Sequence, residues 1–214
     1  MAGFTTGNTD YLTLNIGTVS AAAVVAFGGS EEALNAAAAT CIEISSPRKD
    51  SLVISWLSAG DPYMIAGGVV AGALTTFVQG TATSITTTAT DICHTCISPT
   101  EVALAYCDDA GLDYGVIIRY SVSWASTGAG TFTADSVKDV FAEASVKAGS
   151  NGVSVAFIPN KDAVVAVYTD TGNSSYLTAS YGEFRDDIID IRSAAASATY
   201  SLWLSPVYDY VKTN

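Results

Sequence analysis

Large apolar side chains occupy every second position from Tyr114 to Trp124, and this alternation constrains the fold more than any other feature of the chain. Successive side chains of a β-strand point to opposite faces, whereas an amphipathic helix repeats about every 3.6 residues. The alternation therefore predicts a long strand with one buried face.

Runs of the same period occur along the rest of the chain, separated by turn signals rich in Pro, Gly, Asp and Asn. They are Leu12/Leu14/Ile16, Ile42/Ile44, Leu52/Ile54/Trp56, Val102/Leu104/Tyr106, Val153/Val155/Phe157 and Tyr200/Leu202/Leu204, with Val164–Tyr168 and Ile188–Ile191 as continuous apolar runs. About eight to ten strands at this spacing predict an all-β, mainly antiparallel fold, and we expect a jelly-roll-like β-sandwich. The 214 residues, 49% of them hydrophobic, fit a single domain over residues 1–214, which can include an extended N-terminal arm at about residues 1–10.

One segment, from about Ala134 to Ala148, departs from the period of two. Its apolar residues fall on one helical stripe, and they are Val137, Val140, Phe141 and Ala144. Thr133 can cap the first turn and Gly149 can close the last one. We therefore expect one well-formed α-helix near 134–148, and a weaker helical turn that starts at Ser30.

Charged residues make up 14% of the chain, against about 25% in an ordinary soluble domain. Acidic residues number 21 and basic residues 9, and no charged residue lies between Pro62 and Thr90. The basic residues are scattered, and the first of them is Arg48. Because nucleic-acid binding needs a basic patch or arm, we do not expect direct contact with nucleic acid.

The uncharged segment includes an apolar stretch, Tyr63–Val78, that is about as long as a short membrane helix. Gly67, Gly68 and Gly72 interrupt it, so we expect no stable membrane span, although a membrane-active segment stays as an alternative. We expect a Gly-broken pair of buried strands or an interface loop. The candidate interface residues are Tyr63, Met64, Val69, Val70, Leu74 and Phe77. No basic region precedes the first apolar run, so we expect the chain to fold in the cytoplasm.

The weak metal-site candidates are Cys93, Cys96, Cys107 and His94, with Cys41, elsewhere in the chain, as an alternative to His94. Zinc prefers four soft ligands, which this set could supply. The second half of a zinc ribbon is missing, however. Reduced thiols are therefore our expectation, with a disulfide or a zinc site as alternatives, and we expect no cofactor.

His94 is the sole histidine, so every histidine-dependent mechanism must pass through it. The chain has no Gly-x-Ser-x-Gly motif, and the neighbours of His94 favour a surface or turn residue. We therefore expect no enzyme.

Two groups of carboxylates suggest further candidate sites. Asp108, Asp109 and Asp113 could hold calcium, but a solvated turn is the better interpretation. Asp186, Asp187 and Asp190 could form a glycosidase-like pair, but the flanking Arg185 and Arg192 favour an ion-paired strand edge. The three tryptophans, Trp56, Trp124 and Trp203, lie in expected strands and favour core or interface anchors over a sugar-binding platform.

Two segments resemble strands of the jelly-roll coat proteins of small icosahedral viruses. The first is Glu101–Gly111, a strand that runs into an acidic turn, and the second is Thr199–Pro206, an alternating strand that closes with proline. The resemblance implies a capsid protein, located in the virion and in contact with other virion proteins. The family usually carries a basic arm that faces RNA, and this chain lacks one.

The residues favour self-assembly independently of that resemblance, because many strand edges and few charges make a free monomer prone to aggregate. We expect a structural subunit of a virion that forms symmetric or helical homo-oligomers. A phage tail-tube or decoration protein and an extracellular filament subunit are alternatives within this class. A carbohydrate-binding or adhesin β-sandwich is the alternative from another class.

Overall fold

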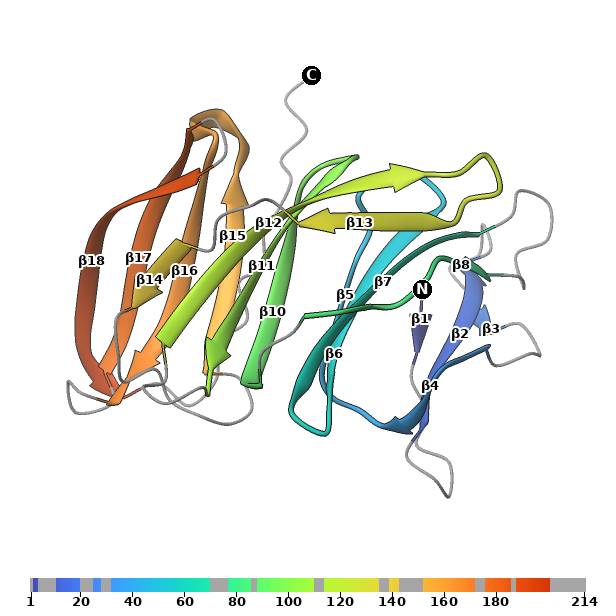
Figure 1. Ribbon diagram of the computed structural model, residues 1–214, viewed down its shortest axis with the longest axis horizontal. Helices are drawn as coiled ribbons and strands as arrows, with labels where there is room; N and C mark the ends of the chain where they lie inside the picture. Colours follow the sequence, from blue (N-terminus) through green and yellow to red (C-terminus); the bar gives the residue numbers. More distant parts are fainter. Residues whose placement is uncertain are drawn as a thin grey trace.

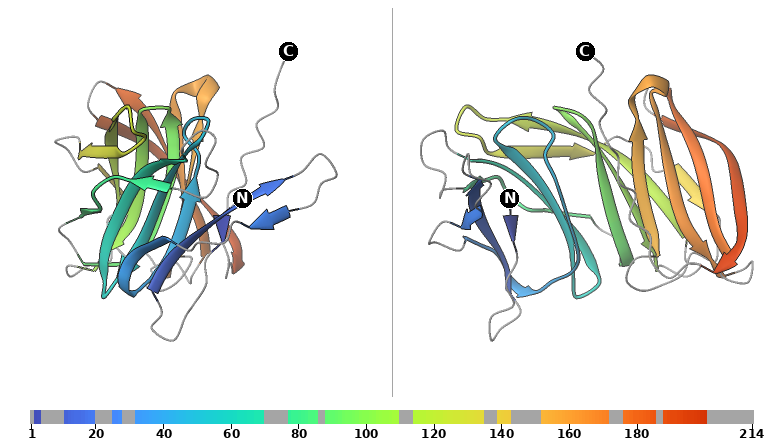
Figure 2. Two further views of the ribbon diagram at one scale, coloured as in Figure 1. Left: turned by 90° about the vertical axis from the view of Figure 1, so that its right-hand side faces the viewer. Right: turned by 180° about the vertical axis from the view of Figure 1, so that it is seen from behind.

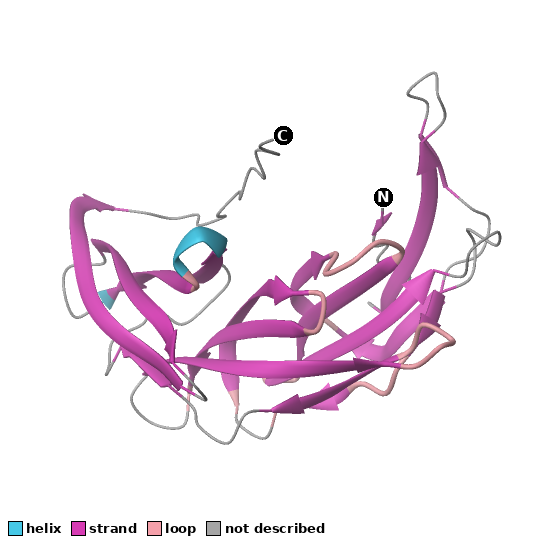
Figure 3. Ribbon diagram, turned by 90° about the horizontal axis from the view of Figure 1, so that it is seen from above, coloured by secondary structure: helices cyan, strands magenta, loops and turns pink. Residues whose placement is uncertain are grey.

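A computed structural model of the chain describes residues 2–3, 11–19, 25–27, 32–69, 77–85, 88–109, 114–134, 139–142, 152–171, 176–185 and 188–200. Over these ranges the fold is all-β and the strands pair antiparallel. No α-helix occurs among the described residues, and the helical turn at Pro159–Lys161 is of the 3-10 type (Figure 3).

The strands run in chain order as β1 (Ala2–Gly3), β2 (Tyr11–Val19), β3 (Val25–Phe27), β4 (Glu32–Ala38), β5 (Thr40–Ser45), β6 (Ser51–Ser58), β7 (Asp61–Val69), β8 (Phe77–Gln79), β9 (Thr83–Ser84), β10 (Ala89–Ser98), β11 (Glu101–Asp108), β12 (Tyr114–Trp124), β13 (Gly130–Ala134), β14 (Asp139–Ala142), β15 (Val153–Ile158), β16 (Ala163–Asp170), β17 (Tyr176–Arg185) and β18 (Ile188–Tyr200). The largest sheet has the order β10-β11-β12-β13-β7-β6-β5, and β15 to β18 form a second sheet in chain order. A small N-terminal sheet contains β1 to β4.

The strands are arranged in layers along the long axis of the molecule (Figures 1 and 2). The N-terminal strands lie at one end and the β15–β18 sheet lies at the other. Between them, the largest sheet curls so that β5, at one edge, lies beside β10, at the other. The result is a nearly closed barrel with a further sheet against it.

Three hydrophobic cores separate the layers, and strands between two cores are buried on both faces. In β6, Val53 and Leu57 face the central core, while Ile54 and Trp56 face the core beneath the N-terminal sheet. In β11, Leu104 faces the central core and the adjacent residues pack against the β15–β18 sheet. Strands with two buried faces accommodate few charged residues, because an unpaired buried charge is very costly. Burial within one chain therefore explains much of the low charge content.

The strand expected from Tyr114 to Trp124 is confirmed as β12, with the expected bounds. Val116, Ile118, Tyr120 and Val122 are buried in the central core. The opposite face is buried only near Ile117, which packs into the core beside the β15–β18 sheet, and is exposed at Ser121 and Ser123. One half of β12 pairs with β13 and the other half with β14.

The α-helix expected near 134–148 is wrong where the structure describes the segment. Residues 139–142 form β14, which pairs with β12 through Val116↔Val140 and Ile117↔Asp139. Phe141 is 5% exposed and Val140 is 45% exposed, so neighbouring residues face opposite sides as in a strand. The free edge of β12 supplies partners for this backbone, and such tertiary pairing overrides a weak helical propensity.

The weaker helical turn expected from Ser30 is also wrong. Residues 32–38 form β4, which pairs with β2 and buries Leu34 in the N-terminal core. Residues 4–10, most of the expected N-terminal arm, lie outside the described residues, while Ala2–Gly3 pair with β2 as β1.

The connections between strands bear on the expected jelly roll. A jelly roll contains Greek keys, in which a long connection returns one strand beside an earlier one. Here consecutive strands pair in β5-β6-β7, in β10-β11-β12-β13 and in β15 to β18, and Gly130↔Ala66 joins the first two groups. These pairings confirm the coarser part of the expected fold class, which is all-β and antiparallel.

The uncharged segment from Pro62 to Thr90 contributes β7, β8 and β9. Gly67 pairs with Gln79, and the ring of Phe77 covers Gly67 so closely that a Cβ atom there would collide with it. The expected Gly-broken strand pair is present as β7 and β8, with β7 buried along most of its length and β8 buried only at Phe77. Among the described residues, no helix combines the length and apolarity needed to cross a membrane.

Candidate functional site at the seam between β5 and β10

The two edges of the largest sheet meet through side chains. Ser45 Oγ on β5 lies 2.7 Å from His94 Nε2 and 2.9 Å from Cys96 Sγ on β10. Ser55 Oγ on β6 lies 2.8 Å from His94 Nδ1. We call Ser45, Ser55, His94 and Cys96 the seam. Because the described strand pairings do not join β5 to β10, these polar contacts close the barrel at this point.

His94 is buried at 6% exposure, so its interpretation as a surface or turn residue is wrong. Burial lowers the pKa of the imidazole to about 4. The ring is therefore neutral at pH 7, with one nitrogen donating a hydrogen bond and the other accepting one. Sequence reasoning missed this environment because His94 lies in a strand whose two faces are covered by segments far away in the chain.

The cysteines do not assemble into the metal site considered from the sequence. Cys93 packs into the core beside the β15–β18 sheet, whereas Cys96 packs against the central core. Residues three apart on a strand face opposite sides, so these two thiols cannot share a metal. Cys107 lies on the same side as Cys93, and Cys41 contacts the central core. All four are free thiols, and no group of three metal-ligating side chains forms within the described ranges.

Asp91 is a buried carboxylate that sequence reasoning did not single out. It is 1% exposed and accepts hydrogen bonds from the backbone N–H groups of Ile92 and Val153, at 2.9 and 2.8 Å. Burial raises its pKa, and the backbone donors oppose that rise. Burial and the nearby Asp91 also raise the pKa of Cys41, to about 11. The sequence signal for Asp91 was its position as a single charged residue within a strand, directly after the long uncharged segment.

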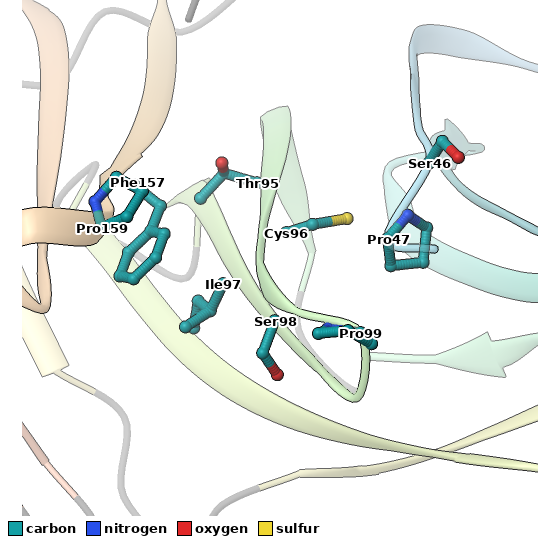
Figure 4. Close-up of a pocket in the computed structure, with 9 residues that line it drawn as sticks. All are labelled: Ser46, Pro47, Thr95, Cys96, Ile97, Ser98, Pro99, Phe157 and Pro159. Atoms are coloured by element: carbon teal, nitrogen blue, oxygen red, sulfur yellow. The ribbon is translucent and has the colours of Figure 1, made fainter. Parts of the chain in front are cut away.

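Two cavities lie along β10. One of about 320 Å³ is lined by Glu43, Ile44, Ser45, Cys93, His94, Thr95, Cys96, Ser154, Val155 and Ala156. The other, of about 560 Å³, is lined by Ser46, Pro47, Thr95 to Pro99, Phe157 and Pro159. Figure 4 shows the larger one, with Phe157 and Pro159 on one side of β10 and Pro47 on the other. The cavities share Thr95 and Cys96, so together they run past the seam.

The candidate interface residues are partly covered by the chain itself. Met64 and Phe77 are buried in the central and N-terminal cores, at 0% and 4% exposure. Tyr63 is half-buried and stacks on Trp56, and Val69 is half-buried. Val70 and Leu74 lie outside the described residues. Of the described candidates, only Tyr63 and Val69 retain appreciable surface.

The two described tryptophans, Trp56 and Trp124, make contacts within the chain. Trp56 is 1% exposed, which confirms it as a core residue. Trp124 donates from Nε1 to the carbonyl of Pro99 at 2.8 Å, and the Arg48 guanidinium lies 4.1 Å from its ring centre. Trp203 lies outside the described residues.

The acidic clusters are only partly described. Asp108 ends β11 half-buried, Asp109 is exposed in the turn that follows, and Asp113 lies outside the described residues. Asp186 and Asp187 lie outside them as well. Asp190 is placed on β18 opposite Glu183, and its side chain is not described.

β18 is the outermost strand of its sheet and the longest strand of the described chain, with 13 residues. It pairs with β17 along one side. Its second half, Ser193–Tyr200, contains no charged residue.

No family model and no curated protein matches the sequence. Among solved structures, the WD40 domain of SCAP from fission yeast is similar to this chain, with a TM-score of 0.40 and 8% sequence identity. The similarity covers 95% of this chain and 56% of that one, so the chain spans little more than half its length. A similarity this low carries no argument about function.

Proposed function

We propose that the protein is a structural subunit that self-assembles by pairing its β18 edge with another copy. We propose a coat protein of a virion, which the sequence resemblance of Glu101–Gly111 and Thr199–Pro206 supports, with a tail-tube, decoration or filament protein as the alternative. The proposal uses the antiparallel all-β fold and does not depend on jelly-roll connectivity.

The outer edge of β18 carries this proposal. A long edge strand presents a row of backbone N–H and C=O groups that can pair with another chain, and monomeric proteins usually blunt such edges with charges, proline or a covering segment. Ser193–Tyr200 contains neither a charge nor a proline. An identical edge on a second copy offers the same groups, so a two-fold antiparallel pairing would be self-complementary.

The low charge content supports the proposal less strongly. Strands buried on both faces within one chain already require few charges, as in β6 and β11. The β18 edge therefore supports self-assembly more strongly than the shortage of charge does.

Light scattering and negative-stain microscopy of the native protein at micromolar concentration test the proposal. We expect defined oligomers, shells or tubes. Ala195→Lys and Ala196→Lys place a charge on opposite faces of β18 and should each shift the protein toward monomer. Thr131→Lys, at an exposed position on β13, is the control and should leave assembly unchanged. A wild-type protein that stays monomeric would overturn the proposal.

The carbohydrate-binding alternative is less well supported. A sugar platform needs an exposed aromatic face, but Trp56 is buried and Arg48 covers one face of the Trp124 ring. We therefore propose no second function on this basis.

A further inference from the structure

We propose that Ser45 is a nucleophile activated by His94, and that the seam accepts esters with a small apolar acyl group. This inference goes beyond self-assembly and is independent of it.

The geometry of the seam meets two requirements of an activated serine. The nucleophile and the base must lie within hydrogen-bond reach, and Ser45 Oγ lies 2.7 Å from His94 Nε2. A third group must orient the base, and Ser55 Oγ lies 2.8 Å from His94 Nδ1. Ser55 is 0% exposed, so its hydroxyl is held in place and acts as a positioning residue.

One tautomer of His94 suits this role. When Nδ1–H donates to Ser55 Oγ, Nε2 carries a free lone pair and accepts the hydrogen bond from the Ser45 hydroxyl. The lowered pKa leaves the ring neutral at pH 7 with this lone pair free, and it also makes the ring a weaker base than an exposed histidine. Cys96 lies 2.9 Å from the same Ser45 oxygen, but burial raises the pKa of its thiol, which disfavours the thiolate.

Access for the ester is a third requirement, and the cavities provide it. Ser45 is half-buried and lines the cavity of about 320 Å³, which has the size of a small ligand pocket. The adjoining cavity of about 560 Å³ is lined by Pro47, Ile97, Pro99, Phe157 and Pro159 (Figure 4). This apolar lining fits a short acyl chain, whose carbonyl would then lie near Ser45.

The reaction is an acyl transfer that needs no further reagent than water. Ser45 Oγ bonds to the ester carbonyl carbon while its proton passes to His94 Nε2. The bond from carbon to the leaving oxygen then breaks, and the leaving group departs with that proton as an alcohol. Water afterwards attacks the acyl-serine, which releases the carboxylic acid and restores the Ser45 hydroxyl.

The experiment uses p-nitrophenyl butyrate as the probe and the full chain at pH 7. We expect a burst of about one p-nitrophenol per chain, with the butyryl group found on Ser45 by peptide mass spectrometry. His94→Gln should slow acylation of Ser45 by about 100-fold or more. Ser123→Ala, at an exposed position on β12, should acylate at the wild-type rate.

The rate of Ser45 acylation distinguishes a positioning role of Ser55 from a purely structural one. Ser55→Ala should slow acylation of Ser45 by about 10-fold while circular dichroism stays unchanged, and Ser55→Thr, which restores a hydroxyl, should recover the rate. The wild-type rate should stay level from pH 7 down to about pH 5 and fall near pH 4, where His94 gains a proton. A wild-type chain with no butyryl on Ser45, or a His94→Gln variant acylated at the wild-type rate, would overturn the inference.

Discussion

Asp91 on β10 accepts a hydrogen bond of 2.8 Å from the backbone N–H of Val153, the first residue of β15. β10 is an edge of the largest sheet and β15 is an edge of the β15–β18 sheet. One buried carboxylate therefore joins two sheets whose edges are not otherwise paired among the described strands.

Asp91→Ala should lower the free energy of unfolding by about 3 kcal/mol, because it leaves two buried N–H groups without an acceptor. Urea unfolding followed by circular dichroism measures the change. Asp109→Ala is the matched control, since Asp109 is exposed, and it should change the free energy by less than about 0.5 kcal/mol. Equal effects of the two variants would contradict the role assigned to Asp91.

Stability should fall as the pH decreases from about 6.5 to 4. The pKa of His94 is about 4 in the folded chain and 6.5 as its ordinary value, so the unfolded chain binds the proton more readily in this range. The total loss should be about 3 kcal/mol at pH 4. Urea unfolding at several pH values measures it.

His94→Gln is the control for that pH dependence, because it removes the titrating ring. Asp91 acts in the opposite direction, since its raised pKa favours the protonated folded chain at low pH. A variant without His94 should therefore show a flat or rising stability over the same range. An unchanged downward slope would show that other groups cause it.

Phe141→Ala should destabilise the chain by about 3–5 kcal/mol, because the ring is 5% exposed and packs against Tyr168 at 5.3 Å between ring centres. Val140→Ala should change stability by less than about 0.5 kcal/mol, because Val140 is exposed on β14. Thermal unfolding compares the two. The helix expected from the sequence put both residues on one stripe, so similar losses would favour the helix over the strand.

Cys96 should react first with iodoacetamide at pH 8, because it is half-buried and lines both cavities. Burial raises its pKa, so the reaction should be slower than that of an exposed thiol. Cys93, with a pKa raised to about 12, and Cys107, which is 0% exposed, should react only on unfolding. Peptide mass spectrometry over time gives the order in which the cysteines are alkylated. Early modification of Cys107 would contradict its burial.

Strand positions followed well from local pattern, because alternation depends on only a few neighbouring residues. The period of two identified β12 with its bounds and, in shorter runs, β2, β5, β6, β11 and β15, while continuous apolar runs identified β16 and the start of β18. The same approach failed at Phe141, because Val137, Val140, Phe141 and Ala144 fit one helical stripe. Only the free edge of β12 decided between helix and strand.

The candidate site could not have been assembled from the sequence. Ser45, Ser55 and His94 lie on three strands, and ordinary serines in strands give no signal that they face a histidine. The sequence instead drew attention to Cys93 and Cys96, whose spacing suits a metal in a turn but places them on opposite faces of a strand.

Residue order alone thus determines that this chain is all-β, where its most regularly alternating strands lie and that it has one histidine through which base chemistry must pass. Tertiary packing decided which sheet edges meet. It therefore also decided that His94 is held between two serines and is not exposed. The physical reason is that side-chain alternation is a local property of the backbone, whereas closure of the sheet depends on burying both faces of β6, β10 and β11 between cores formed by distant segments.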